Sequence, residues 1–316
     1  MPVQEAAITW PSWLCDRDTA ALHAYAVVDP AQDKRLPAVL HAPRNACLLG
    51  DDASIREASP HLVELPDDID SRAWSWLARN GSQQPCAVLV TSELGFDELF
   101  THLLKFLDVQ VNQSTTMLLA WWDPAVLASL LGQPDDDTLY VKGPIFTAEQ
   151  KAAFAMSLCD VGYWDRAGTL HRMNAQQLVA TVPATSGIDG GSVLPLTFDV
   201  GQVRKLVRAT TPDQVLYELR LNRPGVLSDR SDLENYGLAC RLVDAAERYA
   251  IRGMRDLVNF VGAGMILGER FDICPAMASE LEGVRTGTKT FTEMLSSLSP
   301  EVLEQARQSS MECAER

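Results

Sequence analysis

Three aspartates form the strongest case for chemistry in this sequence. Asp29 and Asp123 each follow an apolar run of strand length, and Asp33 lies four residues past Asp29. Carboxyl ends of strands are where α/β sheets usually place active sites, and carboxylate oxygens suit Mg²⁺, which could polarise a phosphoryl group. However, Asp123 also fits a helix N-cap and Asp29-Pro30 a turn opener. No lysine, glycine-rich loop or serine/threonine completes the set.

Other catalytic patterns are missing from the sequence. The histidines at 23, 41, 61, 102 and 171 form no HxxH or HExxH pair, and the cysteines offer no CxxC, so neither a zinc site nor another metal or cofactor site is predicted. Gly262-Ala263-Gly264 lacks the GxGxxG spacing and lies in a helical stripe, which predicts close helix packing. These motifs therefore predict no catalytic chemistry beyond that of the three aspartates.

The charge of the chain narrows the classes of partner. A formal net charge of −15 over 316 residues argues against nucleic acid and anionic membranes. The charge is uneven, because residues 1–200 hold 12 basic and 25 acidic side chains, whereas residues 201–316 hold 15 and 17. The acidic first part predicts either a basic partner surface or simply a solvated face that aids solubility.

The sequence also contains signals of the cellular compartment in which the protein works. No apolar run approaches the length of a membrane helix, so no membrane insertion is expected. The start of the sequence lacks the basic and apolar regions of a secretory signal peptide. Seven cysteines without paired spacing suit a reducing compartment, and we expect a cytoplasmic protein.

The elements that would position these residues alternate between strand and helix in the first part. Apolar runs predict strands at His23–Asp29, Ala46–Leu49, Leu62–Leu65, Cys86–Val90 and Met117–Trp122, with a helical turn at Leu36–Leu40. Trp74 and Trp76 mark one helix, and Ser92 is predicted to cap another whose stripe runs from Phe96 to Leu107. This order predicts a mixed, partly parallel sheet with flanking helices.

The stretch from Met117 to Leu131 is the clearest predicted transition from a strand to a helix, and we call it the strand–helix corner. Its apolar run reads as a buried strand with Trp121 and Trp122 on opposite faces of the sheet, and Asp123-Pro124 as the cap and first turn of a helix. Further strands are predicted at 140–145 and 154–164, followed by a hairpin turn at 165–168.

The second part reads as helix after helix. A capping box, Thr211-Pro212-Asp213-Gln214, predicts a helix start, and further apolar stripes predict an all-α lobe. The composition of residues 183–192, rich in glycine and serine, is typical of a linker. The predicted organisation is an α/β N-terminal lobe over 1–182, a linker over 183–196 and an all-α C-terminal lobe over 197–316.

Three segments of the first lobe resemble the family of type VI secretion effector adaptors, also called effector chaperones and defined by a conserved domain of unknown function (4123). The resemblance covers about residues 22–145 and rests on the first strand, one helix and the strand–helix corner. Its signature residues, which the resemblance implies to be structural, are Tyr25, Asp29, His102, Phe106, Trp122, Asp123 and Pro124. Residues 245–272 are similar to a pattern of the family's helical lobe.

The resemblance implies a non-catalytic function. Family members bind one effector protein in the cytoplasm, keep it soluble and help load it onto the spike protein VgrG. The chain departs from the family at Ala120, Trp121 and Ala125, where basic residues are expected, and residues 146–197 take no part in the match. The expectation is thus an adaptor with an effector and VgrG as partners. A Mg²⁺-dependent hydrolase using Asp29, Asp33 and Asp123, and an immunity or scaffold protein unrelated to loading, are the alternatives.

Overall fold

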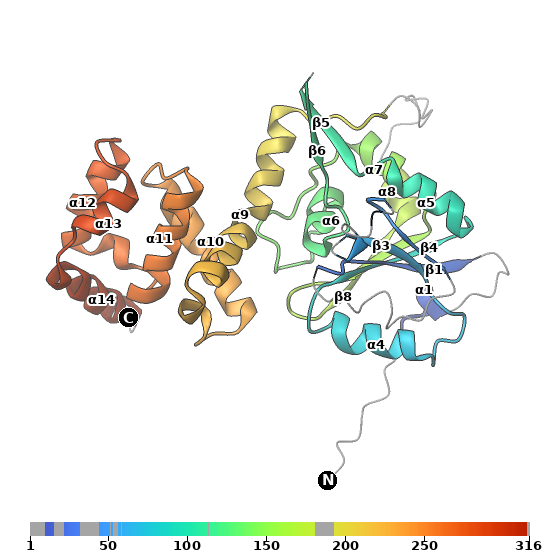
Figure 1. Cartoon of the computed structure of the whole chain (residues 1–316), viewed down its shortest axis with the longest axis horizontal. Helices are drawn as coiled ribbons and strands as arrows, with labels where there is room; N and C mark the ends of the chain where they lie inside the picture. Colours follow the sequence, from blue (N-terminus) through green and yellow to red (C-terminus); the bar gives the residue numbers. More distant parts are fainter. Residues whose placement is uncertain are drawn as a thin grey trace, which may run out of the picture. The chain divides into compact units, whose positions relative to one another are not determined.

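A computed structural model describes residues 10–15, 22–31, 44–50, 52, 56–57, 59–112, 114–180 and 193–314. By its internal packing the chain divides into two compact units, residues 1–207 and 208–316, and the division falls within one helix, α9 (Val200–Asn222). The first unit holds a sheet with helices, and the second is helical (Figure 1). The two predicted classes of structure, α/β followed by all-α, are thus confirmed.

The main sheet is antiparallel throughout. Within the described residues it has six strands, in the order β2-β3-β1-β4-β7-β8. Their bounds are β1 His23–Val28, β2 Asn45–Cys47, β3 His61–Glu64, β4 Ala87–Ser92, β7 Asp160–Trp164 and β8 Leu170–Asn174. Every neighbouring pair is antiparallel, so the predicted partly parallel sheet is wrong. Strands buried on both faces are typical of parallel sheets, but β1, β4 and β7 are buried on both faces in an antiparallel sheet.

Helices cover both faces of this sheet (Figure 1). Among the described residues, the first unit holds the first turns of α9 and the helices α1 Ser12–Cys15, α4 Arg72–Gly81, α5 Phe96–Leu104, α6 Pro124–Leu131, α7 Ala148–Ala155 and α8 Ala175–Ala180. On one face, Ala24 and Ala26 of β1 share a buried cluster with Trp74 of α4. Tyr25 alternates to the other face, where its ring lies 6.3 Å from that of Phe96 in α5.

The Met117–Trp122 run is not a strand of the sheet, and this prediction is wrong. Only its first two residues belong to a strand, β6 (Thr115–Leu118), which pairs with β5 (Asp108–Asn112) in a separate ribbon. Trp121 and Trp122 follow in a turn, both buried, and Trp121 packs edge-on against Phe154 at 5.6 Å. The run is apolar because its last residues form a turn that is buried by aromatic packing. Trp121 and Trp122 therefore do not lie on opposite faces of the sheet.

Three other local predictions need correction. Residues 140–145 form no strand, and residues 154–164 divide between the end of α7 and β7. Ser92 does not cap α5, because Gly95 precedes the helix; the Ser92 hydroxyl instead donates to the Ser157 carbonyl at 2.5 Å. The hairpin turn at 165–168 is confirmed, with Gly168 at φ +83° and its N–H donating to the Asp165 carbonyl. The helical turn predicted at Leu36–Leu40 lies outside the described residues.

The second unit begins within α9, at Arg208. Its further elements are η1 Pro224–Leu227, α10 Asp232–Glu247, α11 Met254–Leu267, η2 Phe271–Ile273, α12 Pro275–Arg285, α13 Phe291–Ser297 and α14 Pro300–Ala314. The rings of Phe271 and Phe291 lie 5.1 and 5.2 Å from that of Phe260 and form the centre of its core. A Cβ on Gly264 would lie 2.4 Å from Leu242, which confirms the close helix packing predicted for this glycine pair.

The predicted helix start at Thr211 is wrong. Helix α9 runs through Pro212 without a break. Proline removes one helical hydrogen bond, but Leu206 before it and Leu216 after it are buried, and this packing favours a continuous helix. The predicted linker lies outside the described residues as far as residue 192, so the predicted domain bounds stay a prediction. Within the described ranges, no helix is both long and apolar enough to cross a membrane.

Candidate functional site

Asp29 and Asp123, two carboxylates of the hydrolase hypothesis, lie close enough to interact. Each of them, however, also has a structural role in its own segment. Asp29 follows β1, and its Oδ1 accepts a hydrogen bond from the Ala31 N–H at 2.9 Å. Asp123 caps α6, where Oδ1 accepts from the N–H groups of Ala125 and Val126 at 2.9 and 3.1 Å. The predicted N-cap with Pro124 in the first turn is thus confirmed. Asp33 lies outside the described residues.

The two carboxylates interact electrostatically. Burial raises the pKa of Asp29, and the charge of Asp123 raises it further, while the hydrogen bond from Ala31 acts in the opposite direction. Two neighbouring carboxylates could share a proton or hold a cation. Among the described residues, however, no third carboxylate, histidine or cysteine completes a metal-ligand group around them.

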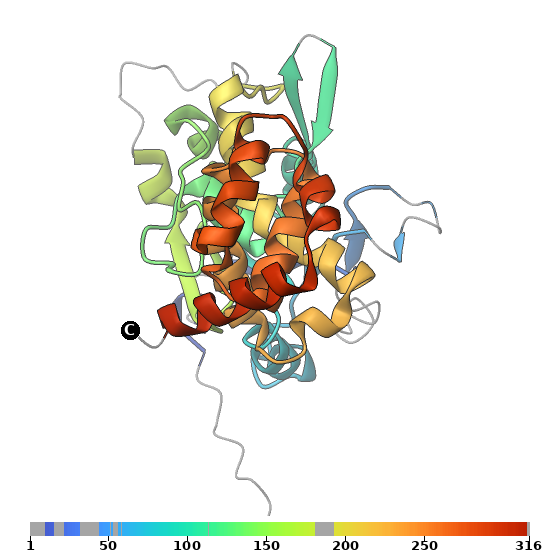
Figure 2. The same ribbon diagram turned by 90° about the vertical axis from the view of Figure 1, so that its left-hand side faces the viewer.

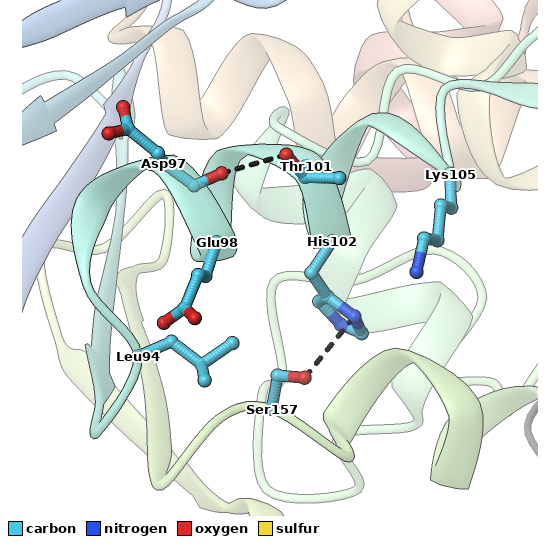
Figure 3. Close-up of a pocket in the computed structure, with 7 residues that line it drawn as sticks. All are labelled: Leu94, Asp97, Glu98, Thr101, His102, Lys105 and Ser157. Atoms are coloured by element: carbon cyan, nitrogen blue, oxygen red, sulfur yellow. Dashed lines mark hydrogen bonds between the residues drawn. The ribbon is translucent and has the colours of Figure 1, made fainter.

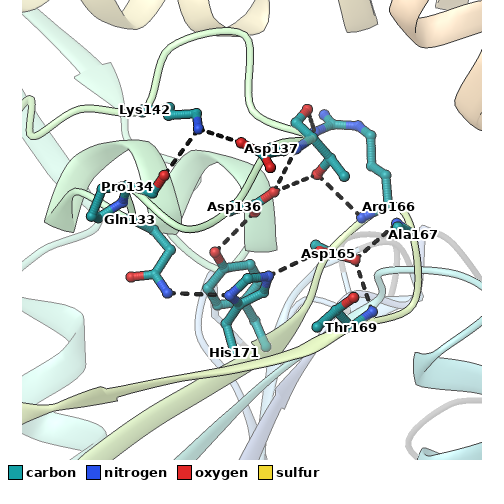
Figure 4. A network of polar contacts seen from close by, with 12 residues as sticks. Gln133, Pro134, Asp136, Asp137, Lys142, Asp165, Arg166, Ala167, Thr169 and His171 are labelled. Atoms are coloured by element: carbon teal, nitrogen blue, oxygen red, sulfur yellow. Dashed lines mark hydrogen bonds and ion pairs between the residues drawn. The ribbon is translucent and has the colours of Figure 1, made fainter.

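Potential metal ligands do gather in a different place, which sequence reasoning missed. Oxygen and nitrogen atoms of Asp136, Asp165 and His171 lie within 4.8 Å of one another (Figure 4). We call these residues, with Tyr163 and Gln133, the buried network. Pairing of β7 with β8 sets His171 opposite Tyr163, and their rings stack 5.2 Å apart. Asp136 comes from the loop after α6.

The hydrogen bonds of the buried network leave its ligand atoms occupied. The Tyr163 hydroxyl donates to Asp136 Oδ2 at 3.0 Å, and the other oxygen of this carboxylate accepts from the N–H and hydroxyl of Thr138. His171 Nε2 donates to Asp165 Oδ2 at 2.9 Å, and Gln133 donates to His171 Nδ1 at 3.2 Å.

Asp165 Oδ1 is occupied as well, because it accepts from the backbone N–H groups of Ala167 and Thr169 at 2.8 Å each. The network therefore closes the β7–β8 hairpin and fastens the loop after α6 to it. Burial raises the pKa of Tyr163 far above its ordinary value, and the charge of Asp136 raises it further. The phenol therefore remains protonated and donates its hydrogen bond. Closed donor and acceptor pairs of this kind are typical of structure rather than of catalysis.

His102, the one family-signature histidine, forms part of a shallow hollow of about 410 Å³ (Figure 3). Charged and polar side chains surround it: Asp97, Glu98, Thr101, Lys105 and Ser157, together with Leu94. The imidazole itself is buried; Nε2 donates to the Phe154 carbonyl at 2.9 Å, and Nδ1 accepts from the Ser157 hydroxyl at 3.3 Å. Burial lowers the pKa of His102, so the ring is neutral and joins α5 to the end of α7.

The other signature residues also make internal contacts. The Tyr25 hydroxyl donates to the Leu94 carbonyl at 2.8 Å, and burial raises its pKa to about 12. Phe106 is buried 5.1 Å from Phe154, and Trp122 is buried against Trp121 at 6.3 Å. The signature thus maps onto the internal framework that joins β1, α5 and α6.

Comparison with known proteins gives one result. No curated protein and no solved structure matched the chain. A family model, described as "Domain of unknown function (DUF4123)", matches residues 24–139. The matched range contains β1 to α6, all seven signature residues and Asp136 of the buried network. Over residues 24–139, from the first strand of its sheet to the loop after α6, the chain is therefore similar to this domain of unknown function.

Proposed function

We propose that the chain is a cytoplasmic adaptor that binds one type VI secretion effector, keeps it soluble and helps load it onto the spike protein VgrG. The observation that carries the proposal is the family match over residues 24–139, since the same range holds the motifs that resemble the effector adaptors. The similarity of residues 245–272 to the adaptors' helical lobe extends this support into the second unit.

The chemistry of the polar clusters supports a binding role. In the described residues, the buried network and His102 use their polar atoms on internal partners, which favours a framework that presents surfaces. The surface of the second unit offers suitable contacts, because Tyr217 and Leu221, one helical turn apart on α9, are 59% and 63% exposed. Tyr217 also lines a shallow hollow together with Met254 of α11. Aromatic and methionine side chains of this kind are common in interfaces.

The proposed mechanism is masking. An effector that exposes apolar surface aggregates unless a partner covers that surface until transfer. The excess of acidic side chains in residues 1–200 favours a partner with basic residues around the apolar patch, because opposite charges speed encounter.

Co-expression tests the proposal. The chain and the effector encoded beside it should co-purify as a stoichiometric complex, and the soluble fraction of the effector should rise relative to its expression alone. An effector paired with a different spike protein serves as the control and should not gain solubility. Addition of purified VgrG should then yield a ternary complex. Absence of both the complex and the solubility gain contradicts the proposal.

A second candidate is a Mg²⁺-dependent hydrolase that uses Asp29, Asp33 and Asp123. The favouring observation is that Asp29 and Asp123 lie close enough for the charge of Asp123 to raise the pKa of Asp29. Turnover of a phosphoester with Mg²⁺, abolished by Asp29→Ala in a protein that still folds, supports the hydrolase. Equal background rates for the wild type and this variant exclude it.

A further inference from the structure

The β5–β6 ribbon projects from the first unit, as two views show (Figures 1 and 2). One of its edges already carries an added segment of the chain. The N–H of Gln110 donates to the Leu196 carbonyl, and the N–H of Phe198 donates to the Gln110 carbonyl, both at 2.8 Å. Residue Thr197 thereby pairs with Gln110 in parallel. The ribbon therefore accepts an extended segment through main-chain hydrogen bonds.

The opposite edge is formed by β6, and its geometry follows from the same bonds. Both backbone groups of Gln110 point away from β6, so Gln110 and Thr116 form a non-hydrogen-bonded pair of the antiparallel ladder. The backbone groups of Thr116 must then point away from β5. Because the ladder alternates, Leu118, the partner of Asp108, is oriented in the same way.

These four outward groups have no hydrogen-bond partner within the part of the chain that the structure describes. They are the N–H and C=O of Thr116 and of Leu118, spaced as one edge of a sheet presents them to a new strand. The Leu118 side chain beside them is 52% exposed.

The composition of β6 keeps this edge open. Proteins usually protect exposed edges with lysine, other charges or proline, and Thr115–Leu118 contains none of these. An uncharged edge with one exposed leucine is a template for β-augmentation, in which main-chain bonds give affinity and alternate side chains give specificity.

We propose that the outer edge of β6 binds an extended segment of a partner polypeptide, which adds a strand to the ribbon and places an apolar side chain against Leu118. The occupant is a different protein with a neutral or basic segment, since a net charge of −15 opposes pairing of two copies of this chain. The proposal rests on the proposed function in one respect: it assigns the segment to the effector.

Amide hydrogen exchange of the complete chain, alone and bound to the co-expressed effector, tests the strand addition. The amides of Thr116 and Leu118 should exchange fast in the free chain and at least about tenfold more slowly in the complex, because they gain main-chain hydrogen bonds. The amide of Met117, which the ladder already pairs with Val109, is the internal reference and should change little.

Two substitutions test the same edge by affinity. Thr116→Pro removes one outward N–H at an edge position that tolerates proline, and Leu118→Lys places a charge against the incoming strand. Each should weaken effector binding by about tenfold or more. Leu104→Lys is the matched control, since Leu104 is also a partly exposed leucine of the first unit, on α5, and it should bind as the wild type does.

The outcomes separate the two proposals. A complex in which Thr116 and Leu118 stay unprotected, and which both edge variants form with wild-type affinity, overturns strand addition and leaves the adaptor function standing. No complex with the wild-type chain overturns the adaptor function and the assignment of the effector to the edge. Dimerisation of the free chain that Leu118→Lys abolishes overturns the choice of a different protein as occupant.

Discussion

The buried network and the β6 edge treat polar groups in opposite ways, although both belong to the first unit. In the network, the carboxylates of Asp136 and Asp165 have both oxygens hydrogen-bonded, and the potential metal ligands hold one another. At the edge, Thr116 and Leu118 present backbone groups without partners among the described residues. Side chains of the types found in catalytic sites thus stabilise the fold, whereas the backbone N–H and C=O groups of Thr116 and Leu118 are available to a binding partner.

This difference predicts a separation of effects. Substitutions in the network should lower the free energy of unfolding and leave affinity of the folded chain unchanged. Substitutions at the edge should lower affinity and leave stability unchanged. The experiments below test this separation, beginning with the largest expected effect.

Asp136→Ala should cause the largest loss of stability. It leaves the buried hydroxyl of Tyr163 and the N–H of Thr138 without their acceptor, which should lower the free energy of unfolding by about 3 kcal/mol. Urea denaturation measures the loss. Asp137→Ala is the control, since this neighbouring carboxylate is exposed and paired with Lys142 at the surface, and it should unfold as the wild type does. Equal stability of the two variants contradicts the structural role of the network.

Asp123→Ala should have a smaller effect. Loss of the cap leaves the N–H groups of Ala125 and Val126 unbonded and should lower the free energy of unfolding by about 1 kcal/mol. Asp123→Asn keeps an oxygen acceptor and should recover most of the loss. If Asn is as destabilising as Ala, capping is not the role of Asp123, and the hydrolase reading gains support.

The pH dependence of stability should identify the buried histidine. The pKa of His102 is lowered by burial and by Lys105, and raised by its hydrogen bond to Phe154, with a net fall below 6.5. A base with a depressed folded-state pKa contributes stability above its unfolded pKa and loses it as the pH falls through the folded value. Stability should therefore decline below about pH 6.5, and His102→Gln should flatten the decline. His61, whose pKa is also lowered by burial, should retain part of it.

The edge variants should show the smallest change in stability. Thr116→Pro and Leu118→Lys alter solvent-facing groups, so each should change the free energy of unfolding by less than about 0.5 kcal/mol. Thermal unfolding of the free proteins checks this. A large destabilisation by either variant means that the edge contributes to the fold, and any loss of affinity could then reflect unfolding.

The sequence predicted local features well. The cap of Asp123 with Pro124, the hairpin turn ending at Gly168 and the close approach at Gly264 all depend on residues near one another or on one residue's size. The pairing of strands was less accessible, because runs such as β1 and β4 are buried on both faces and periodicity does not give their direction.

The buried network could not be predicted for a related reason. Asp136 and Tyr163 lie far apart in sequence, and no local pattern joins them. The register of the β7–β8 hairpin, which its turn sets, places His171 opposite Tyr163, but only tertiary packing brings the loop that holds Asp136 to them. The Met117–Trp122 run is a case in which a local pattern predicts the wrong element. Its apolar residues suggest a strand, but the tryptophans belong to a packed turn.

The binding function is tested most directly by the affinity of the purified wild-type chain for the effector encoded beside it. This affinity is compared with those of Leu118→Lys and Asp136→Ala under conditions where all three are folded. We expect a tight complex for the wild type and Asp136→Ala and an affinity lower by about tenfold or more for Leu118→Lys. No complex with the wild type, and no change in effector solubility on co-expression, contradicts the claim that this protein works by binding.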